Sequence, residues 1–193
     1  MSGKKYTISE FLKFEKISGT RCESYDGKFF SLPEESVNHN RIVNCIKNYL
    51  KGEILQVQSI AIAENVKLEA ERNYFSPDIM LIRELEKTSR IRTVRSPILL
   101  GQVRSKYSSN SDRGYKLRQY LQISSLQYYM LVSQFECLVE LYTRTEQEGF
   151  WTYQSFNKPE SVISCDLLNF TLPVSAIYEG IVFLDEEKPE FEI

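Results

Sequence analysis

Apolar residues recur along this chain with two different spacings, which together predict helices interleaved with strands. Spacing near 3.6 residues is typical of an amphipathic helix, whereas alternation or a short wholly apolar run is typical of a strand. The helical spacing is found in three places: after the capping box Thr7-Ile8-Ser9-Glu10, over Ser36–Leu50 with Gly52 as the expected stop, and over Asp112–Ile123.

Strand-like runs lie between and after these helices. They are Arg21–Tyr25, Lys28–Leu32, Ile54–Ala63, Asn65–Glu69, Ser76–Arg83, Ile98–Arg104, Leu126–Ser133, Cys137–Arg144, Gly149–Phe156 and Phe170–Pro173. Asp26-Gly27 predicts a tight hairpin between the first two runs, and Ser175–Tyr178 a short helical turn. This order predicts an α/β fold in which a mixed central β-sheet is flanked by α-helices. Because no repeat or linker interrupts it, we expect one domain over residues 1–193, ending in a short acidic tail.

Composition excludes several classes of protein. No apolar run approaches the ~18 residues of a membrane helix, and residues 1–5 lack a hydrophobic signal segment, so we expect a cytoplasmic protein without membrane contact. The four cysteines are scattered without a C-x-x-C pair, which argues against a zinc site. His39 is the single histidine, and no G-x-S-x-G motif accompanies it, so a serine-hydrolase triad is not indicated.

Positive charge is concentrated in one stretch of an otherwise acidic chain. Residues 83–118 carry ten Lys or Arg residues and three acidic ones, while the whole chain has a net charge of −2. Such a stretch can form a local phosphate-binding surface, and Arg104, Lys106 and Arg113 are the candidates within it for contacting nucleic acid. The alternative is a solvated loop followed by an exposed helix face.

Three segments predict one chemical site. Pro77 can begin a strand, so Asp78 is expected just inside it, and a second strand presents Gln102 and Arg104 on one face. If these strands are neighbours, Asp78 and Gln102 converge, and the helix that follows can deliver Lys116. Phosphodiester hydrolysis uses such a set, in which oxygen ligands hold Mg²⁺ and a lysine stabilises the anionic transition state. The alternative for the helix is an ordinary surface pair of Asp112 with Lys116.

The order of motifs resembles the Uma-type putative restriction endonuclease family, a branch of the PD-(D/E)XK nuclease superfamily. The resemblance runs from about Tyr6 to Phe183. Its segments are Tyr6-Thr7, Glu10–Leu12, Glu23 with Asp26-Gly27, Asn38–Val43, Tyr74–Asp78, Pro97–Ser105, Asp112–Tyr120, Ile123–Ser133, Val139–Tyr142 and Ile177–Gly180. It implies a restriction-endonuclease-like fold, a DNA substrate, a Mg²⁺ cofactor with Mn²⁺ as a substitute, and a homodimer.

The resemblance also implies roles for individual residues. Asp78 matches the family's metal-binding aspartate, and Lys116 matches a helix lysine that replaces the usual strand lysine. Glu23 matches an additional acidic residue of such sites. His39 matches a histidine at the start of the second helix, for which DNA contact and capping are both open and capping is preferred.

Two departures from the family pattern leave two functions open. Gln102 stands where the family has Glu, beside Arg104, and Lys28 follows Asp26-Gly27 where the family has Glu. An amide oxygen can still bind a metal ion but brings no charge, and Mg²⁺ prefers carboxylates. The first hypothesis is a Mg²⁺-dependent endonuclease with Asp78 and Gln102 as metal ligands. The second is a nuclease-fold protein with little or no catalysis and no cofactor, which binds nucleic acid or a protein partner.

Overall fold

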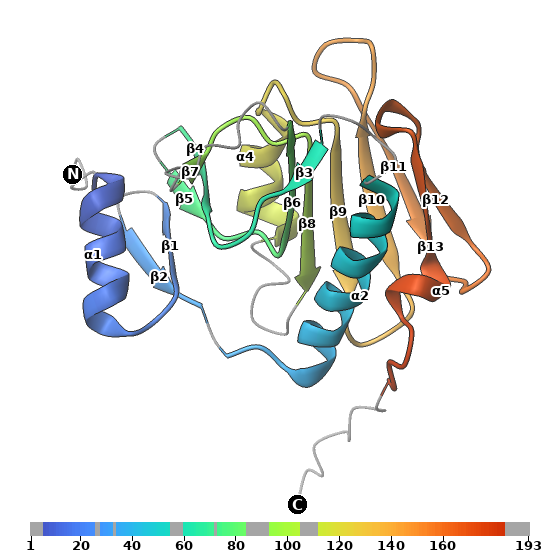
Figure 1. Cartoon of the computed structure of the whole chain (residues 1–193). Coiled ribbons are helices and arrows are strands. Elements are labelled where there is room, and N and C mark those ends of the chain that lie inside the picture. The colour runs from blue at the N-terminus through green and yellow to red at the C-terminus, as the bar shows by residue number, and fades with distance from the viewer. Residues whose placement is uncertain are drawn as a thin grey trace, which may run out of the picture.

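The computed structural model describes residues 6–25, 28–32, 34–54, 60–71, 73–83, 93–104 and 112–183 (Figure 1). These residues form three β-sheets with helices packed against them. The predicted α/β class with a mixed sheet flanked by helices is confirmed. The predicted Asp26-Gly27 turn, the segment 105–111 with Lys106, and the acidic tail lie outside the described residues.

The central sheet has six strands in the order β11-β10-β9-β8-β6-β3. Their bounds are β3 Ile60–Ile62, β6 Ile79–Arg83, β8 Leu99–Arg104, β9 Tyr128–Ser133, β10 Val139–Arg144 and β11 Trp151–Phe156. Only β8 and β9 run parallel, whereas every other neighbouring pair is antiparallel. The start of β6 therefore lies beside the end of β8, and that end of the sheet carries the candidate residues.

Helices cover both faces of this sheet. Helix α2 (Val37–Ile54) packs on one face, where Ile46 shares a core with Ile79 and Leu99. Helix α4 (Leu117–Leu121) covers the opposite face through Tyr120. A π-helical turn, Asp112–Lys116, leads directly into α4. Side chains alternate along a strand, so Gln102 points toward the α4 face.

A five-stranded sheet in the order β2-β1-β5-β4-β7 stands beside the central one. Its strands are β1 Cys22–Tyr25, β2 Lys28–Ser31, β4 Lys67–Ala70, β5 Asn73–Phe75 and β7 Thr93–Val94. Helix α1 (Ile8–Ser18) packs on it through the buried Phe11. The predicted capping box is present, since Thr7 and Glu10 bond each other's backbone N–H, and Gly19 ends α1 with a left-handed φ of 67°.

The third sheet is a hairpin of β12 (Val162–Cys165) and β13 (Phe170–Pro173), joined by a 3₁₀ turn at Asp166–Leu168. The short helix α5 (Val174–Ile177) follows, and its Val174 and Ile177 enter the same core as α2. In the part of the chain described, no helix is both long and apolar enough to span a membrane.

Two element boundaries differ from the prediction. Gly52 does not stop the second helix, which continues to Ile54. Ile54, predicted to begin a strand, instead ends this helix, and the described part of the predicted run contains a strand over Ile60–Ile62, while residues 55–59 lie outside the described residues. Glycine costs an interior helical position only about 1 kcal/mol, and the packing of Leu50 against the core offsets a cost of that size.

Candidate active site

Asp78 lies directly before β6 and faces the end of β8. Its backbone N–H donates to Gly101 O at 3.1 Å, which fixes it opposite that strand. Its carboxylate oxygen Oδ2 accepts hydrogen bonds from Gln102 Nε2 and from Val103 N, both at 2.8 Å. The two residues that the sequence predicts to converge are therefore in direct contact. Gly101 permits this close packing, since a Cβ there would lie 3.1 Å from the Cβ of Ile79.

His39 approaches the same carboxylate from α2. Its Nε2 lies 3.4 Å from Asp78 Oδ2 and 3.5 Å from Glu35 Oε2, and the residue is 3% exposed. Burial opposes protonation, but the nearby carboxylates of Asp78 and Glu35 outweigh it and raise the pKa of His39 above 6.5. The side chain thus faces Asp78. The role of helix cap falls to Ser36, whose Oγ accepts the N–H of His39 at 3.0 Å.

Lys116 is held in a second cluster of buried charge. Its Nζ lies 2.8 Å from Glu23 Oε2 and 3.2 Å from Asp112 Oδ1, and all three side chains are at most 3% exposed. Burial lowers the pKa of Lys116, but Glu23 and Asp112 outweigh this and raise it to about 12. The ammonium is therefore charged at neutral pH. The sequence alternative of a surface pair does not hold, because this pair is buried.

Ser76 connects the two clusters. Its backbone N–H donates to Glu23 Oε1 at 3.0 Å, and its Oγ accepts from Lys67 Nζ at 2.8 Å. Lys67 also bonds Glu15 of α1 at 2.7 Å. The buried Lys116–Glu23 pair and the partly buried Lys67–Glu15 pair thus hold the residue two positions ahead of Asp78, and Glu23 is an interior residue of this network.

Two buried tyrosines, Tyr120 and Tyr129, lie close to these carboxylates. The hydroxyl of Tyr120 has a pKa raised well above 10, first by burial and then by charges that include those of Glu23, Asp112 and Asp78. The pKa of the neighbouring Tyr129 is raised in the same way, first by burial and then by charges that include those of Asp112, Glu23 and Asp78. These carboxylates are therefore close enough to share one electrostatic environment.

A cleft of about 760 Å³ opens onto Asp78. Its walls come from α1, α2 and β4, and Glu35, His39, Lys67 and Ser76 line it together with Asp78. Four Lys or Arg residues and four Glu or Asp residues line the cleft, so its charge is balanced apart from His39. This cleft gives a substrate a route to Asp78.

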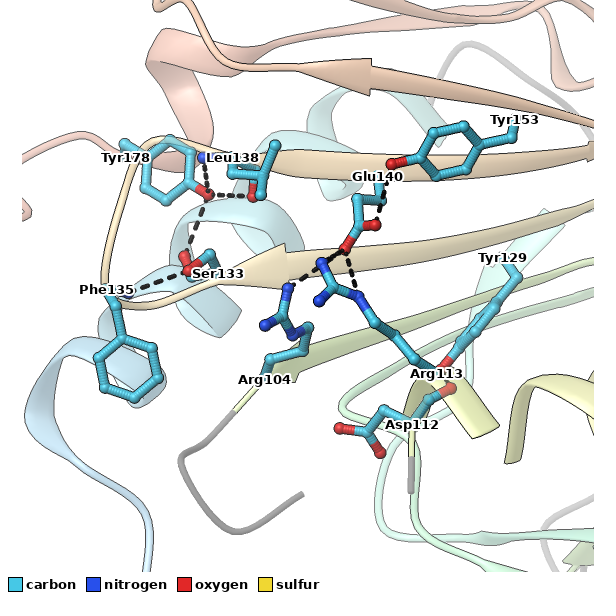
Figure 2. A network of polar contacts seen from close by, with 10 residues as sticks. All are labelled: Arg104, Asp112, Arg113, Tyr129, Ser133, Phe135, Leu138, Glu140, Tyr153 and Tyr178. Carbon is cyan, nitrogen blue, oxygen red and sulfur yellow. Dashed lines mark hydrogen bonds and ion pairs between the residues drawn. The ribbon is translucent and has the colours of Figure 1, made fainter. Parts of the chain in front are cut away.

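Arg104 and Arg113, which the sequence predicts to contact nucleic acid, are both paired with one buried carboxylate. Arg104 and Arg113 both donate to Glu140 Oε2, at 3.2 Å and 3.1 Å (Figure 2). Arg104 is 12% exposed and Arg113 is 43% exposed. The positive charge of Arg104 beside Gln102 is thus compensated by a buried carboxylate that the sequence did not indicate.

Several residues of the site were not anticipated from the sequence. Glu35 could have been found, because it stands only four positions before His39 in the sequence, just ahead of α2. Lys67 and Glu140 could not be connected to the site by spacing, since each meets its partner only through the fold, and the bonds of Ser76 to Glu23 and Lys67 were not indicated either.

The residues around Asp78 fit a weak divalent-metal site. Gln102 Oε1 is buried and has no hydrogen-bond partner within the described part of the chain, so it is an acceptor available to a cation. Among the described residues, no group of three or more His, Cys, Asp or Glu is arranged to hold a metal ion. Mg²⁺ commonly uses one or two carboxylates and completes its shell with water and substrate phosphate. One carboxylate and one amide oxygen meet that minimum.

Known proteins are similar in sequence to most of this chain. Residues 8–175 match the model of the Uma2 family, described as putative restriction endonuclease. Two uncharacterized proteins of Synechocystis sp. are similar to the chain. One is 24% identical over 183 residues, covering 93% of this chain and 94% of the relative. The other is 31% identical over 143 residues, covering 72% and 80%.

A solved structure shares the fold. It is the crystal structure of a putative nuclease belonging to DUF820 from Anabaena variabilis, with a TM-score of 0.74 and 14% identity, covering 92% of this chain and 99% of that one. The expected restriction-endonuclease-like α/β fold is thereby confirmed. With its family model matched over most of its length, the chain belongs to the Uma2 family of putative restriction endonucleases.

Proposed function

We propose that this protein is a Mg²⁺-dependent endonuclease that hydrolyses DNA phosphodiester bonds at Asp78. The observation that carries the proposal is the pair of Asp78 with Gln102, in which a partly buried carboxylate faces a cleft and the buried amide oxygen beside it has no partner among the described residues. Membership of a nuclease family supports the same reaction. The proposal includes the cytoplasmic location that is expected from the sequence.

In this proposal Asp78 and Gln102 hold the metal ion, and Mn²⁺ is expected to replace Mg²⁺. The ion would activate water and neutralise charge on the phosphate. An amide has a donor and an acceptor, so Gln102 can donate to Asp78 in the metal-free protein and offer Oε1 to a cation. The absence of a second carboxylate predicts weak binding that improves when a substrate phosphate supplies a further oxygen.

In this proposal the residues around Asp78 and Gln102 hold charged groups in place and balance the charge of the site. Lys116 is the cation that we assign to the charge developing on the phosphate, and its ion pairs with Glu23 and Asp112 hold it in place. Glu23 also fixes the N–H of Ser76, two residues before Asp78. His39, when protonated, places a positive charge 3.4 Å from Asp78 and so competes with a metal ion for it.

A second candidate function is nucleic-acid or protein binding with little or no cleavage. The observation that favours it is that Asp78 Oδ2 already accepts two hydrogen bonds, from Gln102 and Val103, with His39 close by. Where the family has a charged glutamate, this chain has a donor that satisfies the aspartate without metal. In this alternative the protein needs no cofactor.

Calorimetric titration with Mn²⁺ and Mg²⁺, with and without a DNA duplex, tests the proposal. The wild-type protein is expected to bind metal weakly alone and more tightly with DNA, and Asp78→Asn is expected to abolish binding in both cases. Equal metal binding by wild type and Asp78→Asn would remove Asp78 from the site. DNA binding without any metal binding would favour the second candidate.

The proposal includes a homodimer. Cutting both strands of a duplex needs two active sites, and each chain supplies one candidate site. This part rests on analogy with the superfamily, so it is tested separately below.

A further inference from the structure

Glu140 is a buried acidic residue that holds two arginines at once. It lies on β10 and is 5% exposed. Its Oε2 accepts from Arg104 Nη1 and from both Nε and Nη2 of Arg113, while Oε1 accepts from the hydroxyl of Tyr153 at 3.0 Å. Figure 2 shows the two guanidinium groups converging on this carboxylate from β8 and from the π-helical turn.

This cluster lies on the same face of the sheet as the candidate site. Gln102 is paired with Leu131, and Leu131 is paired with Glu140, so the three residues form one row across β8, β9 and β10. Residues in one row point to the same face, and two strand spacings separate Gln102 from Glu140 by about 10 Å. Glu140 is therefore a neighbour of the site across the sheet.

Arg113 connects Glu140 to the segment that carries Lys116. It is the second residue of the π-helical turn, next to Asp112, whose backbone oxygen accepts from the Tyr129 hydroxyl at 3.3 Å. Single π-helical turns are rare overall, but many of those that occur lie at functional sites. The wider turn changes the directions in which its side chains point. Here the side chains of Asp112 and Lys116 point toward each other and pair, whereas the side chain of Arg113 points toward Glu140.

We propose that Glu140 is a positioning residue of the candidate site: it anchors the turn that carries Asp112 and Lys116, and it withholds Arg104 and Arg113 from nucleic acid. This inference rests on the proposed function for its link to cleavage. It changes the role expected for the two arginines, which become internal partners of a carboxylate rather than contacts to phosphate.

The geometry disfavours two other roles for Glu140. A metal ligand needs a free carboxylate oxygen, whereas Oε2 accepts three N–H donors and Oε1 accepts a hydroxyl. A surface ion pair would contribute little, but this carboxylate is 6% exposed and Arg104 is 12% exposed, so its removal takes a shielded counter-charge away from the two arginines that it binds.

The test compares Glu140→Gln with the wild type in three measurements. The first is DNA affinity by fluorescence anisotropy at several salt concentrations in EDTA. The second is amide hydrogen exchange over residues 112–121. The third is turnover on DNA in Mg²⁺. Glu148→Gln is the matched control, because Glu148 is exposed in the turn after β10 and loses the same charge.

Glu140→Gln is expected to bind DNA more tightly, with the slope of log affinity against log salt steeper by about 0.9 for each arginine that gains a phosphate. Exchange over 112–116 should become faster, and turnover should fall on the order of ten- to a hundredfold because Lys116 loses its fixed position. Tighter binding with slower turnover distinguishes positioning from a general loss of stability. Glu148→Gln should change none of the three.

Arg113→Gln separates the two halves of the proposal and serves if Glu140→Gln does not fold. It should speed exchange over 112–116 without making the salt slope shallower, whereas Arg118→Gln, a change on the exposed side of α4, should leave exchange unaltered. A slope shallower by about 0.9 in Arg113→Gln would show that Arg113 already binds phosphate, and would overturn the proposal. The proposal would also be overturned if the amides of residues 112–116 exchanged at the wild-type rate in Glu140→Gln.

The exchange measurement needs neither metal nor DNA. A wild-type protein that never cleaves DNA would therefore defeat the proposed function while leaving the anchoring role of Glu140 to stand or fall by exchange alone.

Discussion

Replacing Lys116 by methionine removes a charge whose contribution can be worked out from the structure. The ammonium is shared by Glu23 at 2.8 Å and Asp112 at 3.2 Å, and all three side chains are almost wholly buried. A pKa raised from 10.5 to about 12 corresponds to about 2 kcal/mol in favour of the charged lysine. Because the folded pKa is the higher one, this contribution is fully present below pH 10.5 and is lost only as pH rises through about 12.

The full cost of Lys116→Met is larger, since two carboxylates are left in the interior without their cation. Removing one partner of a buried pair typically costs about 3–5 kcal/mol. In a chain of this size that is a fall in Tm of roughly 6–20 °C. The deficit should shrink as pH falls from about 7.5 to 5, because one of the crowded carboxylates can then bind a proton.

Thermal unfolding of Lys116→Met over that pH range provides the assay, with Lys158→Met as the control at an exposed lysine. The control should unfold within about 2 °C of the wild type at every pH. A Lys116→Met variant that behaves like this control, or one whose deficit does not depend on pH, would refute the buried-pair account.

Three further predictions concern Asp78, its neighbours and assembly. The single imidazole, His39, should titrate above 6.5 by NMR, and its contribution to stability should be full below 6.5 and lost as pH rises through the raised pKa, so His39→Gln should flatten thermal stability between about pH 6 and 8. A titration at or below 6.5 would contradict this. Gln102→Glu should lower Tm in EDTA, because two carboxylates meet where an amide donated at 2.8 Å, and Mg²⁺ should restore it. No metal effect on that Tm would place Gln102 outside a metal site. Light scattering should give a dimer, whereas a mass near 22.6 kDa at micromolar concentration would count against one.

Local signals in the sequence predicted much of the fold. The capping box Thr7–Glu10 and the strand over β13 need only neighbouring residues, and both are found as expected. Shorter elements were missed: β7 has two residues and β5 has three, too few for a period to be recognised. β7 depends on pairing with the distant β4, and β5 pairs both with β4, close by along the chain, and with the distant β1.

The same difference between local and distant information applies to the candidate site. Proline punctuation and strand alternation predicted that Asp78 and Gln102 would converge, and the two side chains are in contact. The partners of the charged residues were not predictable in this way. Lys116 and Glu23 are 93 positions apart in sequence. Glu140 meets Arg113 of the π-helical turn, which helical periodicity alone does not distinguish from an ordinary α-helix.

The most direct measurement of the central claim is strand breakage of a supercoiled plasmid in Mg²⁺, compared across wild type, Gln102→Glu and Asp78→Ala. The wild type should nick the plasmid in a reaction that EDTA abolishes, Gln102→Glu should nick it more because it adds a charge at the metal, and Asp78→Ala should not nick it. The opposite result would be equal strand breakage in all three proteins, or none in either wild type or Gln102→Glu while both remain folded and bind the plasmid.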